Sequence, residues 1–226
     1  MEGNKAYLVG GRDKSPVNVY NPTNRQWTQE PGPGLKLHHM QCVAADNKIW
    51  IVSAWTGNCC SEQNVPDIYI YDTIAKKWQT KPGLPEERRR GGGAAVLHDR
   101  DIYLVAGNRG GHGKGKGHTL AWFDKYNIDS GQWTVNLTNA PHARDHTGGG
   151  MVDGKLCVAS GRDGGAVDYF NATSSPPDAI TMVLMVDGVE GNQTVTVPCG
   201  RCQRTSMHSS NVTDRAREGP RIVSYR

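Results

Sequence analysis

The chain has 226 residues, and its formal net charge of +4 is small beside 26 basic and 22 acidic side chains. A charge this weak and dispersed does not predict a nucleic-acid-binding protein. No apolar run of about 18 residues occurs, so the sequence predicts no membrane span. Glycine is abundant, with 28 residues, and six tryptophans outnumber two phenylalanines. This composition favours short strands joined by turns over long helices.

Short apolar strands recur through the first three quarters of the chain. In order they are "KAYLVGG" (5–11), "KIWIVSA" (48–54), "DIYLVAG" (101–107) and "KLCVASG" (155–161). Each of the last three follows another short strand across a hairpin-type turn, with the sequences "DNK", "HDRD" and "DGK". No window of about 12 residues shows the apolar period of a helix. The sequence therefore predicts an all-β fold.

A second pattern repeats in step with these strands. Its three copies are "VNVYNPTNRQW" (17–27), "IYIYDTIAKKW" (68–78) and "FDKYNIDSGQW" (123–133). Each copy runs from a tyrosine through a polar turn to a tryptophan, and the copies recur about every 50 residues, a period typical of propeller blades. Each unit offers four short strands that could not bury their faces alone.

These features resemble the kelch repeat. The kelch features present are the glycine doublet Gly10-Gly11 at a strand end, the Tyr-Asn or Tyr-Asp turn and the closing tryptophan, over roughly residues 5–165. The resemblance implies a kelch-type β-propeller, and the number of repeats implies an incomplete sector of four-stranded blades. We expect kelch repeats over 1–169. We divide them into a partial blade (1–33), two blades (34–83 and 84–139) and a second partial blade (140–169). Residues 170–226 lack the repeat, and we expect an irregular tail there, disordered or aberrant.

By the same resemblance, the connection between the second and third strands of each blade lies at one mouth of the propeller. The segments that lead into each blade, here called lead-ins (35–42, 87–93 and 142–147), lie there too. The lead-ins carry basic or titratable groups at equivalent places. The candidate binding residues are His39, Arg89, Arg90, His112, Lys114, Lys116, His118, Arg144 and His146. Such a rim favours an acidic protein or a glycan partner. The alternative is that the lead-in arginines pair with neighbouring blades or cap loop carbonyls.

Other chemistry at the glycine-rich segment 107–118 is less favoured. Gly110 to Lys116 matches G-x-x-x-x-G-K, but Gly117 replaces the Ser or Thr of a P-loop and a strand, not a helix, follows. A metal site needs three or four converging ligands. His112 and His118 could meet only at an entropic cost, although His142 and His146 could approach. Cys199 and Cys202 have the spacing of half a zinc site. We therefore expect no metal, no cofactor and no catalytic residues.

The function predicted from the sequence is a binding module without chemistry of its own. The alternative is a fragment of a secreted galactose-oxidase-like copper-radical oxidase, or of another carbohydrate-active propeller protein. Open blade edges would permit self-association. The N-terminus has no signal-peptide pattern, while four glycosylation sequons, at Asn136, Asn171, Asn192 and Asn211, favour a secreted location.

Overall fold

The computed structural model describes residues 5–112, 117–152, 154–159 and 161–162. Two four-stranded antiparallel sheets form its centre, each with its strands in chain order from the first to the last. One contains β4 (Val43–Ala45), β5 (Lys48–Ile51), β8 (Asp67–Asp72) and β9 (Lys77–Pro82). The other contains β10 (Ala94–His98), β11 (Asp101–Val105), β14 (Phe123–Asn127) and β15 (Gln132–Thr134). We call each such sheet a blade and name it by its first strand.

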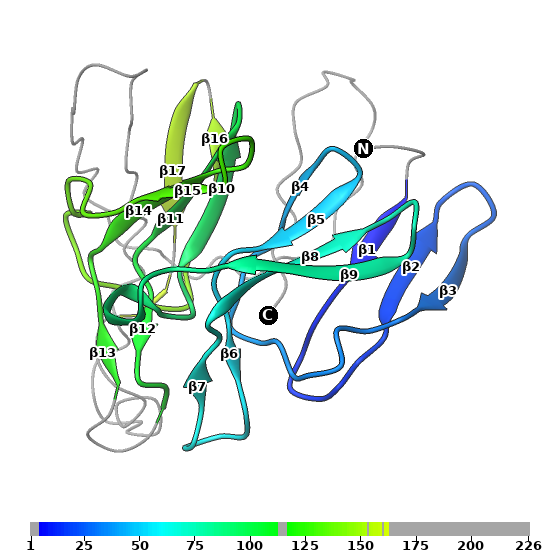
Figure 1. Cartoon of the computed structure of the whole chain (residues 1–226), viewed down its shortest axis with the longest axis horizontal. Coiled ribbons are helices and arrows are strands. Elements are labelled where there is room, and N and C mark those ends of the chain that lie inside the picture. Colours follow the sequence, from blue (N-terminus) through cyan, green and yellow to red (C-terminus); the bar gives the residue numbers. More distant parts are fainter. Residues whose placement is uncertain (1–4, 113–116, 153, 160, 163–226) are drawn as a thin grey trace, which may run out of the picture.

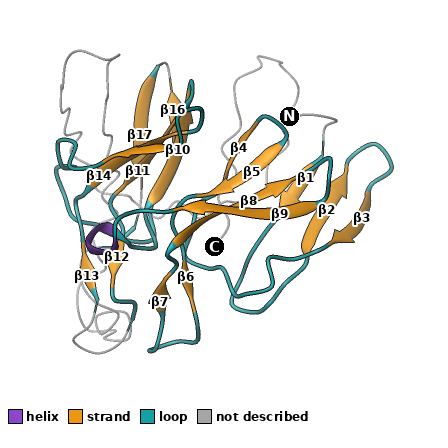
Figure 2. Ribbon diagram, in the orientation of Figure 1, coloured by secondary structure: helices purple, strands orange, loops and turns teal. Residues whose placement is uncertain are grey.

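A smaller sheet flanks each side of this central pair (Figure 1). The β1 blade has three strands, β1 (Ala6–Leu8), β2 (Val17–Asn21) and β3 (Gln26–Glu30). The β16 blade is described as the hairpin of β16 (Gly148–Val152) and β17 (Lys155–Ala159). The prediction of an all-β fold is confirmed, since the one helical element described is the short 3-10 turn η1 (Glu86–Arg88) (Figure 2). Each sheet lies within one of the predicted repeat ranges, whereas the tail from 170 lies outside the described residues.

The tyrosine and tryptophan of each repeat face one another across the last two strands of a blade. The three cross-strand pairs have ring centroids 5.1, 5.1 and 5.2 Å apart, and they are Tyr20–Trp27, Tyr71–Trp78 and Tyr126–Trp133. Aromatic pairs in this position stabilise an antiparallel ladder. The tyrosine and tryptophan that recur in the sequence are therefore cross-strand partners in the same register in each of the three blades.

Hydrophobic cores lie between successive blades. Trp50, Ile68 and Ile70 of the β4 blade pack against Ile102 and Tyr126 of the β10 blade. The indole of Trp78 also donates a hydrogen bond of 2.8 Å to the carbonyl of Pro31 in the chain leaving the β1 blade. Both faces of the central blades are therefore covered by their neighbours.

Two additional hairpins extend the connections between the second and third strands of the central blades. One consists of β6 (Trp55–Thr56) and β7 (Gln63–Asn64), and the other of β12 (Asn108–Arg109) and β13 (His118–Thr119). Both project from the same side of the molecule (Figure 1). We call this side, made of the two hairpins and the lead-ins, the mouth.

No helix in the described part of the chain is long and apolar enough to cross a membrane.

Candidate functional site

The three lead-ins share one backbone geometry at the mouth. His39, Gly92 and His146 occupy equivalent positions and have left-handed φ angles of 52°, 71° and 58°. The residue before each one bridges to a residue three or four positions beyond the second strand of its own blade, in the pairs His38–Trp55, Gly91–Asn108 and Asp145–Arg162. The amide of Gly92 donates to the carbonyl of His39 at 2.7 Å, and that of Thr147 donates to Gly92 at 3.2 Å. Consecutive lead-ins are therefore bonded side by side.

Three histidines gather at this ring of lead-ins. His39 and His146 come from lead-ins on either side of Gly92, and His112 comes from the segment after β12. One ligand-type nitrogen of each ring lies within 4.8 Å of those of the other two. The ring centroids are 4.7 Å apart for His39–His112 and for His39–His146, and 5.3 Å apart for His112–His146. We call His39, His112 and His146 the histidine cluster.

Gly92 makes room for this approach because it has no side chain. A Cβ atom added there would lie 3.2 Å from the backbone nitrogen of His146 and 3.8 Å from its Nδ1. The left-handed φ of Gly92 also suits glycine better than any other residue. The histidines of the flanking lead-ins can therefore meet in the space beside it.

Glu62 fixes the position of His112. Its carboxylate accepts the backbone amide of His112 at 3.1 Å and the ring Nδ1 at 2.8 Å. A Cβ on the preceding Gly111 would come within 2.9 Å of Glu62, so only glycine permits this approach. The amide of Cys60 binds the same carboxylate at 3.0 Å, which ties it to its own hairpin. Through Glu62 the two projecting hairpins are joined.

Each ring of the histidine cluster has a partner for Nδ1. The partner of His112 is Glu62, and that of His146 is Asp145, at 3.1 Å. The Nδ1 of His39 lies 2.6 Å from the Nδ1 of His38, whose Nε2 lies 3.0 Å from the carbonyl of Gly57. A carbonyl only accepts, so His38 carries its proton on Nε2 and accepts at Nδ1 from His39. All three rings of the cluster thus carry a proton on Nδ1, which leaves Nε2 as the nitrogen that can bind a ligand; Nε2 of His146 also lies 3.4 Å from Nη2 of Arg162.

Trp55 packs against the cluster from the β6–β7 hairpin. It is completely buried, and its ring centroid lies 4.6 Å from that of His39 and 5.0 Å from that of His112. Its indole donates to Asn64 across the hairpin at 3.0 Å, which fixes the ring orientation. The histidine cluster therefore has a rigid aromatic wall on one side.

Burial and charge shape the electrostatics of this site. Burial, reinforced by the neighbouring histidines, lowers the pKa of His39 to about 3, so its ring is neutral at physiological pH. Burial disfavours the charge of Glu62, but hydrogen bonds from His112 outweigh this and lower its pKa to about 2. The pKa of Asp145 is also lowered, because hydrogen bonds and charges from His146 and Arg162 outweigh its burial. Two carboxylates thus stand behind the rings.

The arginines of the β10 lead-in do not contribute to an exposed rim. Arg90 is 1% exposed, and its guanidinium pairs with Asp124 at 2.6 Å and donates to the carbonyls of Leu104 and Ala106. Burial lowers its pKa to about 10, with Asp124 opposing the shift, so it remains charged. Arg88 pairs with the other oxygen of Asp124 at 2.6 Å. The alternative considered for these residues was pairing with neighbouring blades or capping of carbonyls. Arg88 and Arg90 instead pair with Asp124 of their own blade, while the carbonyl contacts of Arg90 match the second part of that alternative.

The other predicted binding residues divide into three groups. Arg144, like Arg90, is buried, and Arg89 is half-buried and donates to the carbonyl of Leu84. His118 is exposed on β13, paired in register with Arg109, and does not join the cluster. Lys114 and Lys116 lie outside the described residues, as do Cys199 and Cys202.

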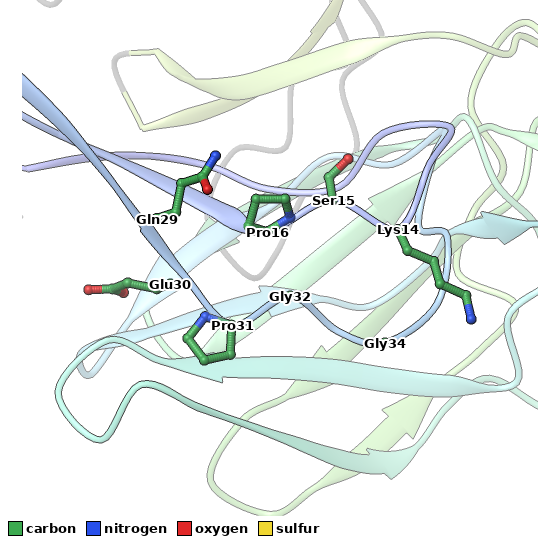
Figure 3. Close-up of a pocket in the computed structure, with 8 residues that line it drawn as sticks. All are labelled: Lys14, Ser15, Pro16, Gln29, Glu30, Pro31, Gly32 and Gly34. Atoms are coloured by element: carbon green, nitrogen blue, oxygen red, sulfur yellow. The ribbon is translucent and has the colours of Figure 1, made fainter.

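A separate recess lies beside the β1 blade (Figure 3). It has a volume of about 500 Å³ and is lined by Lys14, Ser15, Pro16, Gln29, Glu30, Pro31, Gly32 and Gly34. The carboxylate of Glu30 is already paired with Tyr71 and Lys76. The one acidic side chain that lines this recess is therefore already engaged.

Sequence reasoning identified the three histidines as candidates but not their partners. The sequence-based hypothesis of a metal site combined His112 with His118 and allowed His142 and His146 to approach, whereas the structure brings His112 to His39 and His146. Trp55 and Glu62 were unassigned residues of a long connection. One signal was available, because aligning the lead-ins on the repeat puts His39, Gly92 and His146 in a single column.

The donor set of the cluster suits metal coordination or hydrogen bonding better than the other chemistries considered. Three imidazole nitrogens can bind a transition-metal ion or accept hydrogen bonds from a ligand. A copper-radical oxidase would in addition need tyrosines at the metal. Among the described residues, the aromatic rings in contact with the cluster are those of histidine and tryptophan.

Comparisons with known proteins agree with this fold. No family model matches the chain. Kelch-like protein terF of Aspergillus terreus is 27% identical over 201 residues, 77% of this chain and 41% of that protein. Human Kelch repeat and BTB domain-containing protein 12 is 25% identical over 190 residues, 71% of this chain and 29% of that protein. The chain thus spans less than half the length of either relative.

A solved structure shows the same architecture. The structure of YjhT, a kelch-type propeller, has a TM-score of 0.57 with 14% identity, covering 72% of this chain and 57% of that one. The blade topology, the recurring Tyr–Trp register and these likenesses confirm the resemblance drawn from the sequence. The chain is a kelch-type β-propeller sector.

Proposed function

We propose that the chain is a binding module that recognises a protein partner through its mouth. The observation that carries this proposal is the convergence of two hairpins and three lead-ins from successive blades on one face. The sheet faces are occupied by packing between blades. Loops on a rigid scaffold are where propellers place their binding residues, and the likeness to kelch-repeat proteins supports the same assignment.

The exposed charges of the mouth favour a partner with acidic side chains. Arg12 lies beside the mouth, where it pairs with Glu62 of the β6–β7 hairpin and still exposes 51% of its side chain; His118 is exposed beside the half-buried Arg109 on the β12–β13 hairpin. The two carboxylates nearest the cluster, Glu62 and Asp145, are buried and already paired. Cationic groups left at the rim attract acidic surfaces and steer their association.

Changing charges at the mouth, and at control positions away from it, tests this proposal. Partners are first isolated on the wild-type chain from its source cells, and the affinity of each purified partner is then measured. The variant Arg109→Glu with His118→Glu reverses the mouth, and Lys114→Ala with Lys116→Ala removes charge from the same connection. Ile74→Glu with Val152→Glu adds two carboxylates at exposed positions away from the mouth.

We expect the mouth variants to weaken binding, most strongly at low salt, while the Ile74/Val152 variant binds like wild type. A partner whose affinity is unaffected by the mouth variants, or falls equally with the Ile74/Val152 control, contradicts the proposal.

A further inference from the structure

The geometry points to a binding site for one first-row divalent transition-metal ion, such as Zn²⁺, held by Nε2 of His39, His112 and His146. This inference concerns the histidine cluster itself and does not rest on the proposed protein partner. It is drawn from the convergence of the three rings, the state of their nitrogens and the groups behind them.

The state of the nitrogens is the first argument. Imidazole binds a metal through an unprotonated nitrogen, and the other nitrogen donates its proton to a fixed acceptor. All three rings of the cluster meet both conditions, with His38, Glu62 and Asp145 as the acceptors behind them. Within the described part of the chain, Nε2 of His39 and of His112 makes no hydrogen bond.

The spacing of the rings is the second argument. The nitrogens lie within 4.8 Å of one another, and three ligands about 2.0–2.1 Å from a tetrahedral Zn²⁺ are about 3.3 Å apart. Side-chain rotation that moves the ring nitrogens by about 1 Å or slightly more therefore brings them to the spacing of a tetrahedral site. His146 is the most exposed of the three histidines and has the most room for this movement.

Neighbouring charges are compatible with a cation. Glu62 and Asp145 contribute two negative charges directly behind the ligands, and Arg12 and Arg162 balance them. The Nη2 of Arg162 lies 3.4 Å from Nε2 of His146, a long contact that metal binding would displace. Its Nε would keep its 3.0 Å contact with Asp145.

The donor set indicates the class of ion. Three imidazoles suit Zn²⁺, Cu²⁺, Ni²⁺ or Fe²⁺ better than the oxygen-seeking Mg²⁺ and Ca²⁺. Three protein ligands leave a fourth position of a tetrahedral ion for water or another ligand. His146 exposes 34% of its side chain, so this position is reached from the solvent side.

The test uses the full chain with Zn²⁺ in calorimetry and Co²⁺ in absorption spectroscopy. Cys59 and Cys60 are exposed, adjacent thiols, and Cys199 and Cys202 have the spacing of half a zinc site, so all proteins carry serine at these four positions. We expect one equivalent of metal and a Co²⁺ spectrum without thiolate charge-transfer bands. His112→Ala should weaken Zn²⁺ binding by more than 100-fold, and Glu62→Gln by about 10–100-fold, the usual effect of removing an acceptor behind a ligand.

Matched controls are available on the same segments. His118→Ala lies on the hairpin of His112, and His142→Ala lies in the lead-in of His146; both histidines are exposed and outside the cluster. Neither should change the affinity. A readout that needs no variant is the ¹⁵N shift of Nε2, which Zn²⁺ should change in the three cluster histidines alone. The proposal is overturned if the folded protein binds no Zn²⁺, or if His112→Ala binds as tightly as its parent.

Discussion

The lead-in of the β10 blade has the same backbone conformation as the lead-ins of the two neighbouring blades, but its side chains have a different role. All three place a left-handed residue beside the next blade, and interblade hydrogen bonds join them. In the β10 lead-in the charged groups turn inward, where Arg90 and Asp124 form a buried pair, and the left-handed residue is glycine. In the flanking lead-ins that residue is a histidine directed to the mouth. One lead-in thus holds the structure together and makes room, and its neighbours supply the chemistry.

The largest expected effect is on the structural side of this comparison. Asp124→Asn leaves Arg88 and Arg90 buried without a carboxylate, and breaking a buried pair destabilises a protein by about 3–5 kcal/mol. Urea unfolding measures the change in the free energy of unfolding. Asp129→Asn, which weakens the exposed Arg100 network, serves as the control and should change stability little. Equal stability of the two variants would show that the β10 lead-in has no structural role.

The repeated tryptophans allow a similar comparison, between a residue that packs between two blades and one that is exposed to solvent. Trp78 packs between two blades and donates to Pro31, whereas Trp27 is 57% exposed on the outer strand β3. We expect Trp78→Ala to lower the free energy of unfolding by about 2 kcal/mol or more. Trp27→Ala should cost less than about 1 kcal/mol. Unfolding curves that rank the two variants in the reverse order would contradict the interblade packing described here.

Gly92 tests whether the middle lead-in makes room for the histidines. Gly92→Ala and Gly34→Ala both place a side chain on a left-handed backbone, at a cost of about 1–2 kcal/mol. An added Cβ meets His146 only at Gly92, and at Gly34 nothing lies within 4 Å. Gly92→Ala should therefore be less stable than Gly34→Ala by about 1 kcal/mol or more. It should also shift the NMR signals of the His146 ring, which Gly34→Ala should leave in place.

The smallest expected effect is a pH dependence far from the mouth. Burial tends to raise the pKa of Glu30, but hydrogen bonds from Tyr71 and Lys76 outweigh it and hold the pKa below the usual 4.5. A carboxylate with a lowered pKa stabilises the fold above the unfolded-state pKa, and this contribution is lost as the pH falls through the folded-state pKa. Glu30→Gln should thus be less stable than wild type near about pH 6, and the difference should shrink below about pH 4. A difference that grows on acidification would contradict this assignment.

Much of the fold follows from the sequence. Local geometry and burial determine the alternating strands, the hairpin turns and the spacing between the tyrosine and the tryptophan of each repeat. A repeated sequence shows these patterns several times, which makes them easy to recognise. The all-β prediction is confirmed for this reason. Side chains that break the repeat were harder to interpret, because Arg90 and His39 are both polar residues near the same lead-in position. Arg90 turns inward because it pairs with Asp124, which lies in another strand and comes next to Arg90 only when the blade folds.

The histidine cluster could be predicted only in part. The sequence showed that His39, His112 and His146 belong to segments on one face, but not that His112 approaches the lead-ins instead of His118. That choice depends on Glu62, which reaches His112 from the neighbouring blade's hairpin. A contact between two loops of unequal length has no counterpart in the repeat, so neither period nor composition reveals it.

The most direct test of this account is the protonation state of the three rings, read from a long-range ¹H–¹⁵N spectrum of the metal-free protein at neutral pH. The hydrogen-bond partners predict that His39, His112 and His146 each carry a proton on Nδ1, while the exposed His118 and His142 serve as references. A cluster ring without a proton on Nδ1 would contradict this hydrogen-bond arrangement.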